Sequence, residues 1–139
     1  DPGLNIPQGT LADGLVKTVR SIKSAGVTPY ILMEVPNHKV PVPKALLARE
    51  VLGTDIHSYI CTPSRLADQN WEMKELIPSL TAAGAQVIDV SDHFFDFDSE
   101  VYRMDHEGIA LYWDDHHLTR HGASFARQSL APILHPGSR

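Results

Sequence analysis

Twice along this chain a helical pattern of apolar residues ends at a glycine and gives way to an apolar run, and this succession most constrains the fold. The first pattern ends at Gly26 and is followed by the apolar segment 27–35. The second ends at Gly84 and is followed by the segment 86–90. Near-continuous apolar runs after helices are typical of parallel strands covered on both faces. The alternation therefore predicts an α/β fold with a parallel sheet.

The helices before these strands can be outlined from their caps and apolar positions. Thr10 is placed to cap the first, and Ser64 to cap the second, which Pro78 is expected to kink or break. The stripe of the first helix is expected to consist of Leu11, Leu15, Val19 and Ile22, and that of the second of Leu66, Met73, Ile77 and Leu80.

Three further segments lie outside this alternation. The proline-rich loop 36–43 could form a substrate-facing wall or a rigid solvent loop, and it leads into a short helix 44–52 that closes at Gly53. Segment 55–63 is predicted to be a short strand or an extended loop. The acidic and aromatic segment 91–100 is predicted to be a loop or short turn whose phenylalanines pack inward.

The last third of the chain is predicted to contain a hairpin and a final helix. Segments 101–104 and 109–113 could pair around a turn at Glu107-Gly108. Thr119 is a good N-cap for a final helix. The apolar face of that helix is expected to comprise Ala123, Ala126, Leu130 and Ile133.

The acidic and histidine residues of 114–117 fall between the end of that apolar run and Thr119. Such strand-to-helix junctions are where ligands and catalytic groups gather in open α/β folds. The carboxylate of Asp114 can accept a hydrogen bond from one imidazole nitrogen of His117, which leaves the other nitrogen as a base for a hydroxyl nucleophile. The spacing therefore predicts the orienter and the base of a Ser-His-Asp triad.

The pattern Asp114-x-x-His117-Leu118-Thr119-x-x-Gly122-Ala123 resembles the last conserved block of SGNH hydrolases. It is most similar to the version fused to acyltransferase-3 membrane proteins, in which a serine often stands at the position of Thr119. Segment 31–36 and the prolines at 41 and 43 resemble the mid-domain strand and loop of that subfamily. The resemblance covers most of the chain from about Leu11 onward.

This resemblance implies a three-layer, mostly parallel sheet with helices on both faces, flavodoxin-like in the manner of SGNH hydrolases. It implies O-acyl, most often O-acetyl, transfer to a cell-surface or secreted glycan, without a cofactor. His117 would be the general base and then the general acid, Asp114 would orient it, and Gly122 would let the helix start pack closely. The implied partners are an acyl donor, a glycan acceptor and an acyltransferase-3 membrane domain in the parent protein, in a periplasmic or other extracytoplasmic location.

The nucleophile of this family is a serine in an N-terminal Gly-Asp-Ser, which does not occur in this sequence. Ser91 follows a predicted strand but lacks the glycine, and the chain opens on Asp1 rather than on an initiator methionine. We therefore expect residues 1–139 to be a single domain or domain fragment, the C-terminal portion of an SGNH domain. One or two N-terminal strands and the nucleophile would come from elsewhere.

Other functions stay open at this point. The chain could belong to a free-standing SGNH esterase, or be a non-catalytic binding or scaffold module that lacks the nucleophile. A metal site is a further alternative, since His117 and His121 are four residues apart and zinc accepts histidine and carboxylate ligands. Its other candidate ligands are Asp114, Asp115, His116, His93 and His106. No HExxH motif or cysteine pair accompanies them, so no metal is assigned.

Composition excludes some classes of function. The formal net charge is −5 and no basic run occurs, which argues against nucleic-acid binding. The hydrophobic fraction of 42% is sufficient for a core, and no apolar run approaches the roughly 20 residues that span a bilayer. Cys61, the only cysteine, is expected to be a small, semi-buried thiol without a catalytic role.

Overall fold

The computed structural model describes residues 9–134, so the expected lead-in before Gly9 and the segment after Leu134 lie outside the described residues. The chain divides into two compact units that are each formed from two stretches of sequence. Unit 1 consists of Asp1–Leu32 and Glu72–Ile88, and unit 2 of Met33–Trp71 and Asp89–Arg139. We describe each unit by itself.

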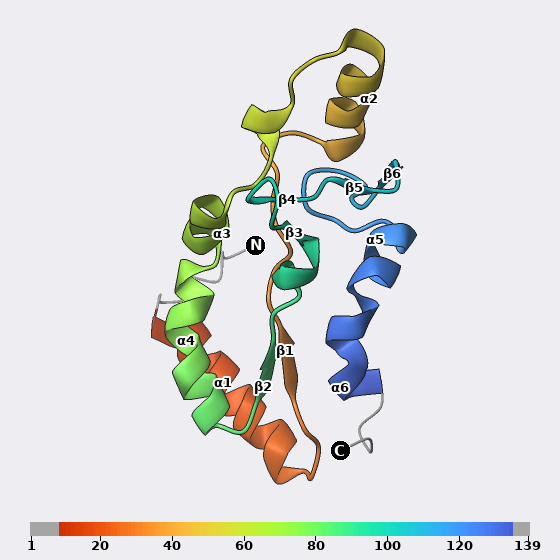
Figure 1. Ribbon diagram of the computed structural model, residues 1–139. Coiled ribbons are helices and arrows are strands. Elements are labelled where there is room, and N and C mark those ends of the chain that lie inside the picture. Colours follow the sequence, from red (N-terminus) through yellow and green to blue (C-terminus); the bar gives the residue numbers. More distant parts are fainter. Residues whose placement is uncertain (1–8, 135–139) are drawn as a thin grey trace, which may run out of the picture. The chain divides into compact units, whose positions relative to one another are not determined.

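Unit 1 contains the parallel strand pair that the sequence predicts. Its elements are α1 (Gly9–Ser24), β1 (Tyr30–Leu32), nearly all of α4 (Trp71–Ala82) and β2 (Gln86–Ile88). The strands β1 and β2 lie side by side and run in parallel, with Ile31 opposite Val87 (Figure 1). Each strand has only three residues, so both are shorter than predicted.

The core of unit 1 is formed by apolar residues of α1, of α4 and of the segment between α4 and β2. Its members are Val19, Leu80, Ala83 and Ala85, with Leu15, Val16, Ile31, Met73 and Leu76 packed against them. Leu11 and Ile22 were expected in this core but are exposed. A helix of 16 residues is about 24 Å long and overhangs strands of about 10 Å. Leu32 is 54% exposed, so β1 is not covered on both faces as predicted.

The long helix predicted across 66–80 is divided in two at Asn70, not at Pro78. Its first part, α3 (Pro63–Gln69), belongs to unit 2, where Thr62 rather than Ser64 is the N-cap. Pro78 lies inside α4, and both Pro78 and Lys74 are exposed. Water can therefore satisfy the Lys74 carbonyl that the proline leaves without a donor, and the helix continues.

The helix α2 (Val42–Leu52) of unit 2 confirms the predicted helix after the proline-rich loop. It ends at Gly53, whose φ of 62° is left-handed and whose N–H bonds back to the Ala48 and Arg49 carbonyls. Segment 55–63 was predicted to be a short strand or an extended loop. Its middle is neither, since η1 (His57–Tyr59) is a 3-10 turn.

The strands of unit 2 are short and antiparallel. After the turn η2 (Ser91–Phe94), β3 (Phe95–Asp96) pairs with β4 (Val101–Tyr102), and β5 (Asp105–His106) pairs with β6 (Ile109–Ala110). The predicted turn at Glu107-Gly108 is confirmed, because both residues have positive φ, 54° and 77°. The predicted partners are wrong in part, since Val101 and Tyr102 pair with β3. Phe94 is buried as predicted, whereas Phe97 is 79% exposed.

The end of unit 2 differs from the single helix that the sequence predicts. The chain forms α5 (Arg120–Phe125), η3 (Ala126–Leu130) and α6 (Ala131–Leu134) in succession. Ala126 is buried, but Ala123 and Ile133 are exposed. The 3-10 turn changes the helical phase before Ile133. Residues 111–113 form no strand and only a single bridge, between Tyr112 and Leu118.

The described residues thus form an α/β fold with three two-stranded sheets, of which only β1–β2 is parallel. The predicted three-layer sheet is not present among them. None of the helices in the described part of the chain combines the length and apolar character needed to cross a membrane.

Candidate active site

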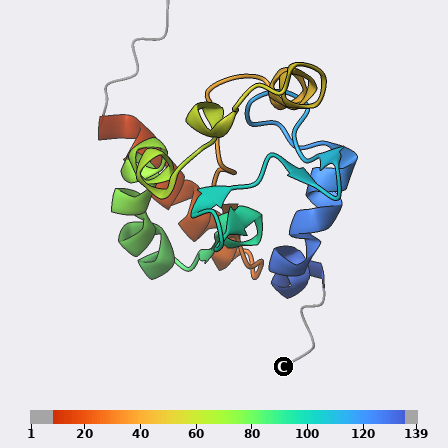
Figure 2. The ribbon, with the colours of Figure 1, turned by 45° about the horizontal axis from the view of Figure 1, so that its top comes forward.

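The candidate site lies on a tight loop that follows β6 in unit 2. The Trp113 N–H donates to the His117 carbonyl at 2.6 Å, and the bridge between Tyr112 and Leu118 closes the loop just outside that bond. Figure 2 shows this part of the chain, in blue, running beside α2. Tyr112 is fully buried, whereas Trp113 is 77% exposed.

Thr119 and Gly122 fix the loop against the start of α5. The Thr119 hydroxyl accepts from the Gly122 N–H at 3.0 Å and donates to the Ala110 carbonyl at 2.9 Å. A Cβ at Gly122 would collide with the Leu111 carbonyl oxygen and lie 3.2 Å from Cδ2 of Leu118. The predicted N-cap and the predicted close packing at Gly122 are both confirmed.

The carboxylate of Asp114 is held by the loop that carries it. Its Oδ1 accepts from the backbone N–H of His116 at 3.0 Å and from that of His117 at 2.8 Å. Its Oδ2 lies 2.8 Å from Nδ1 of His117. These backbone donors, together with the His117 ring, hold the pKa of Asp114 well below its usual range. Asp114 is therefore ionised at neutral pH.

This arrangement fixes the tautomer of His117. Because an ionised carboxylate only accepts hydrogen bonds, Nδ1 of His117 carries the proton and donates it to Asp114. Nε2 is then left with a free lone pair and can act as a base. The side chain of His117 is 69% exposed. The contact that the sequence predicts between Asp114 and His117 is present, while their part in catalysis stays a prediction.

The neighbours Asp115 and His116 form a second pair beside the first. Nδ1 of His116 lies 3.0 Å from Oδ1 of Asp115, and the rings of His116 and His117 lie 4.0 Å apart between centroids. The side chains of Asp115 and His116 are 38% and 45% exposed, so each lies partly open to solvent.

Two groups of the candidate metal ligands come together in unit 2, and His93 belongs to neither. Asp114, His116 and His117 offer ligand atoms within 4.8 Å of one another. His117 and His121 do not share a helix face, because Thr119 caps α5 and leaves His117 outside the helix. The ring of His121 instead stacks on that of His106, with 6.1 Å between centroids. The larger cluster that the sequence allowed is therefore not formed.

The proline-rich loop forms backbone hydrogen bonds with the loop that carries the candidate site. The His38 N–H donates to the Asp115 carbonyl at 2.9 Å, and the Val42 N–H donates to the Asp114 carbonyl at 2.9 Å. These two bonds tie the backbone of the loop to the two acidic residues. Pro36 and His38 are fully buried, so the alternative of a rigid loop in solvent is wrong for this part of the segment.

Sequence analysis missed His38, which is the buried centre of this support. Its Nδ1 accepts from the Cys61 N–H at 3.1 Å, and its ring packs edge-on against Tyr112 with 4.8 Å between centroids. Burial, followed by the positive charge of Arg65, lowers the pKa of His38 to about 4. The ring is therefore neutral at neutral pH. A single histidine between prolines has no periodicity, so the sequence carried no signal for its burial.

A hydrogen bond between Ser129 and His93 offers a second possible nucleophile and base. The Ser129 hydroxyl lies 2.8 Å from Nδ1 of His93. Among the described residues no carboxylate hydrogen-bonds to His93, and no serine hydroxyl hydrogen-bonds to His117. The Ser129 pair thus has a hydroxyl without an orienting acid. The Asp114 pair has the acid and the base without the hydroxyl.

A histidine oriented by an ionised carboxylate, on a loop of an α/β chain, is an arrangement that hydrolases and acyltransferases use to activate a nucleophile. The family model for the SGNH domain (fused to AT3 domains) matches residues 1–132, and the chain belongs to this family. No curated protein and no solved structure matches the chain in these comparisons. Family membership confirms the resemblance drawn from residues 114–123 and assigns the chain to acyl-transfer or esterase-type function in the context of acyltransferase-3 domains.

Proposed function

We propose that this chain supplies the base and the orienting acid for O-acetyl transfer to a cell-surface glycan, in the periplasm or another extracytoplasmic location. The observation that carries the proposal is the geometry at Asp114, whose two oxygens hold both the backbone and the ring of His117. An oriented histidine with a free Nε2 is what a serine hydroxyl requires to become a nucleophile.

In the proposed reaction, Nε2 of His117 takes the proton of a serine hydroxyl while the serine oxygen attacks the carbonyl carbon of an acyl donor. The remainder of the donor takes the proton from His117 and leaves, and the acyl group remains on the serine as an ester. A glycan hydroxyl then attacks that ester, its proton passes to His117, and the serine leaves and recovers its proton. Asp114 stabilises the imidazolium in both halves. The serine is assigned to a Gly-Asp-Ser segment of the parent polypeptide, because this sequence has none.

We also propose that the strand pair of unit 1 is part of a three-layer, mostly parallel sheet in the parent protein. Parallel sheets occur almost entirely with several strands and with both faces covered. The pair β1–β2 has two strands, and Leu32 on β1 is 54% exposed. Additional strands and helices of the parent would cover that residue.

Ester hydrolysis is a second candidate function, and the exposure of His117 favours it. A base whose side chain is 69% exposed can activate water as readily as a sugar hydroxyl. The acyl ester would then be hydrolysed rather than transferred. The ratio of free acetate to acetylated glycan, measured in one reaction, separates a transferase from an esterase.

The decisive experiment compares three variants of the parent protein. His117→Gln removes the base, and we expect transfer to fall by a factor of about a thousand or more. Asp114→Asn keeps an oxygen for the two backbone N–H groups but presents an NH₂ to Nδ1 of His117. His117 would then carry its proton on Nε2, so we expect a loss of similar size without a loss of fold.

His57→Gln is the matched control, because His57 is an exposed histidine of unit 2 outside this loop. Acetylation of the glycan is followed by mass spectrometry, and folding by circular dichroism. Wild-type acetylation in folded His117→Gln protein would remove His117 from the mechanism. A parent protein without any Gly-Asp-Ser would favour a non-catalytic binding module instead.

A further inference from the structure

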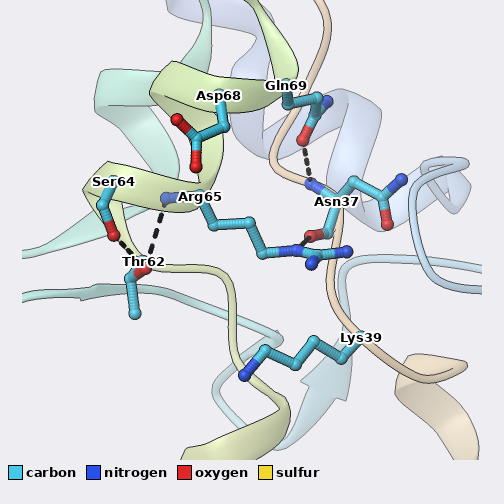
Figure 3. Close-up of a pocket in the computed structure, with 7 residues that line it drawn as sticks. All are labelled: Asn37, Lys39, Thr62, Ser64, Arg65, Asp68 and Gln69. Carbon is cyan, nitrogen blue, oxygen red and sulfur yellow. Dashed lines mark hydrogen bonds between the residues drawn. The ribbon is translucent and has the colours of Figure 1, made fainter.

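A polar cavity of about 560 Å³ lies in unit 2 between the proline-rich loop and α3. Figure 3 shows Lys39 and Arg65 extending into it from opposite sides, with Thr62 on its wall. All of its lining side chains are polar or charged. The volume is within the range of small-molecule sites, and the polarity excludes an apolar ligand.

The cavity carries two cations and one acid. Among the lining residues Lys39 and Arg65 are opposed by Asp68, and neither cation forms an ion pair with a carboxylate of residues 9–134. The carboxylate of Glu34 accepts a hydrogen bond from Nε2 of Gln69, another lining residue, at 3.1 Å. Nε of Arg65 donates to the Asn37 carbonyl at 2.9 Å, which holds the guanidinium in place and leaves its two terminal nitrogens available. Such a preorganised guanidinium suits the two oxygens of a carboxylate or a phosphate.

The cavity and the candidate active site share one stretch of backbone. Asn37 and Lys39 line the cavity, and the N–H of His38 between them donates to the Asp115 carbonyl. Three residues after Lys39, the Val42 N–H donates to the Asp114 carbonyl. A ligand held by Lys39 is therefore bound on the same segment that supports the proposed base and its orienting acid.

We propose that this cavity binds an oxyanion, a carboxylate or a phosphate, carried by the sugar that the protein acetylates. The anion would lie between Lys39 and Arg65. This deepens the proposed function, since it rests on that function for the statement that the bound sugar is the acceptor.

The test measures binding of three probes to the parent protein by isothermal titration calorimetry. The probes are glucuronate, glucose 6-phosphate and methyl glucoside, which share a ring and differ in charge. We expect at least one charged sugar to bind about tenfold or more tightly than the neutral one, and the tighter of the two identifies the oxyanion. Equal affinity for all three probes, or binding of none, would overturn the proposal.

Variants of the lining residues make the test specific to this cavity. Lys39→Gln should lower the affinity for the charged probe by about tenfold. Lys44→Gln makes the same change on the exposed face of α2 and should leave that affinity unchanged. Asp68→Asn should strengthen binding by about threefold, because it removes the opposing charge. Equal effects of Lys39→Gln and Lys44→Gln would assign the binding to net charge and refute the site.

Binding and catalysis can fail separately in this design. His117→Gln removes the proposed base without touching the cavity, so it should bind the charged probe as the wild type does. If acetylation does not depend on His117 but the probe still binds through Lys39, the proposed function fails and the oxyanion site stands. If acetylation depends on His117 and no probe binds, the oxyanion site fails alone.

Discussion

Both units bury apolar side chains, but unit 2 also holds its loops with hydrogen bonds from side chains to backbone groups. Unit 1 has α1, α4 and the parallel strands around an apolar cluster that includes Val19 and Leu80. Unit 2 has short antiparallel strands, and its loops are held by side chains that bond to backbone groups, as Thr119 and Asp114 do. At its centre is a buried histidine, His38.

This difference shows which unit fixes the orientation of individual side chains. Apolar contacts are non-directional, so unit 1 tolerates changes of shape that keep its volume. Hydrogen bonds to backbone groups depend on distance and angle, so unit 2 fixes individual atoms in place. The side chains that need exact orientation, Asp114 and His117, are in unit 2.

The largest expected effect compares one glycine from each unit. Gly122→Ala places a Cβ against the Leu111 carbonyl in unit 2, and we expect it to lower the free energy of unfolding by roughly 4 kcal/mol. Gly14→Ala meets no atom within 4 Å on α1 in unit 1 and should raise that free energy by up to about 1 kcal/mol. Urea denaturation measures both, and equal effects would contradict the close approach at Gly122.

The next effect tests whether unit 1 depends on volume alone. Leu80 is fully buried, so Leu80→Ala should lower the free energy of unfolding by roughly 3 kcal/mol through the cavity it leaves. Leu80→Met keeps most of the volume and should cost about 1 kcal/mol or less. Denaturant titrations of the two variants give the comparison. A methionine variant as unstable as the alanine variant would show that shape also matters in unit 1.

A pH dependence distinguishes the buried polar centre of unit 2. The pKa of His38 is lowered by burial from 6.5 to about 4, so between these pH values the unfolded chain binds a proton that the folded chain does not. Stability is therefore lost as the pH falls through this window, by roughly 2.5 kcal/mol between neutral pH and about pH 4.5.

His38→Gln should remove this pH-dependent part, even though the variant is less stable at neutral pH. His57→Gln, a change at an exposed histidine, should keep the wild-type dependence. Urea denaturation at several pH values measures all three proteins. If His38→Gln and the wild type lose stability in parallel on acidification, His38 is not the group that titrates.

The smallest effect tests a single cap in unit 2. Thr119→Ala removes the hydroxyl that accepts from the Gly122 N–H, and we expect a loss of about 1 kcal/mol in the free energy of unfolding. Thr119→Ser keeps that hydroxyl and should stay within about 0.5 kcal/mol of the wild type. Thermal denaturation resolves the two variants. A serine variant as unstable as the alanine variant would assign the effect to the lost methyl group.

The sequence predicts those features that a short stretch of residues determines. Thr119 and Gly53 were identified as helix ends because caps depend on neighbours within a few residues. The turn at Glu107-Gly108 was identified for the same reason. Apolar periodicity also identified Val19 and Leu80 as core positions and the strands around Ile31 and Val87 as a parallel pair.

Features that depend on distant residues were not predictable from such patterns. The exposure of Leu11 and Leu32 depends on how far the strand pair extends, which periodicity does not encode. The burial of His38 results from contacts with remote segments, such as the hydrogen bond from the Cys61 N–H. At the candidate site, spacing brought Asp114 and His117 together, but the cavity beside Lys39 is formed by α3 and a loop that the sequence separates.

The carboxylate at position 114 is anchored by amides that belong to the same four consecutive residues as the imidazole it steers. The hydrogen bonds that set the tautomer of the base are therefore made within these four residues, while the proline-rich loop supports the backbone that carries them. Substitutions in the cavity walls can therefore alter which sugar is admitted while the proton-handling part keeps its tautomer. Such a separation would allow acceptor specificity to diverge among related chains without loss of the chemistry.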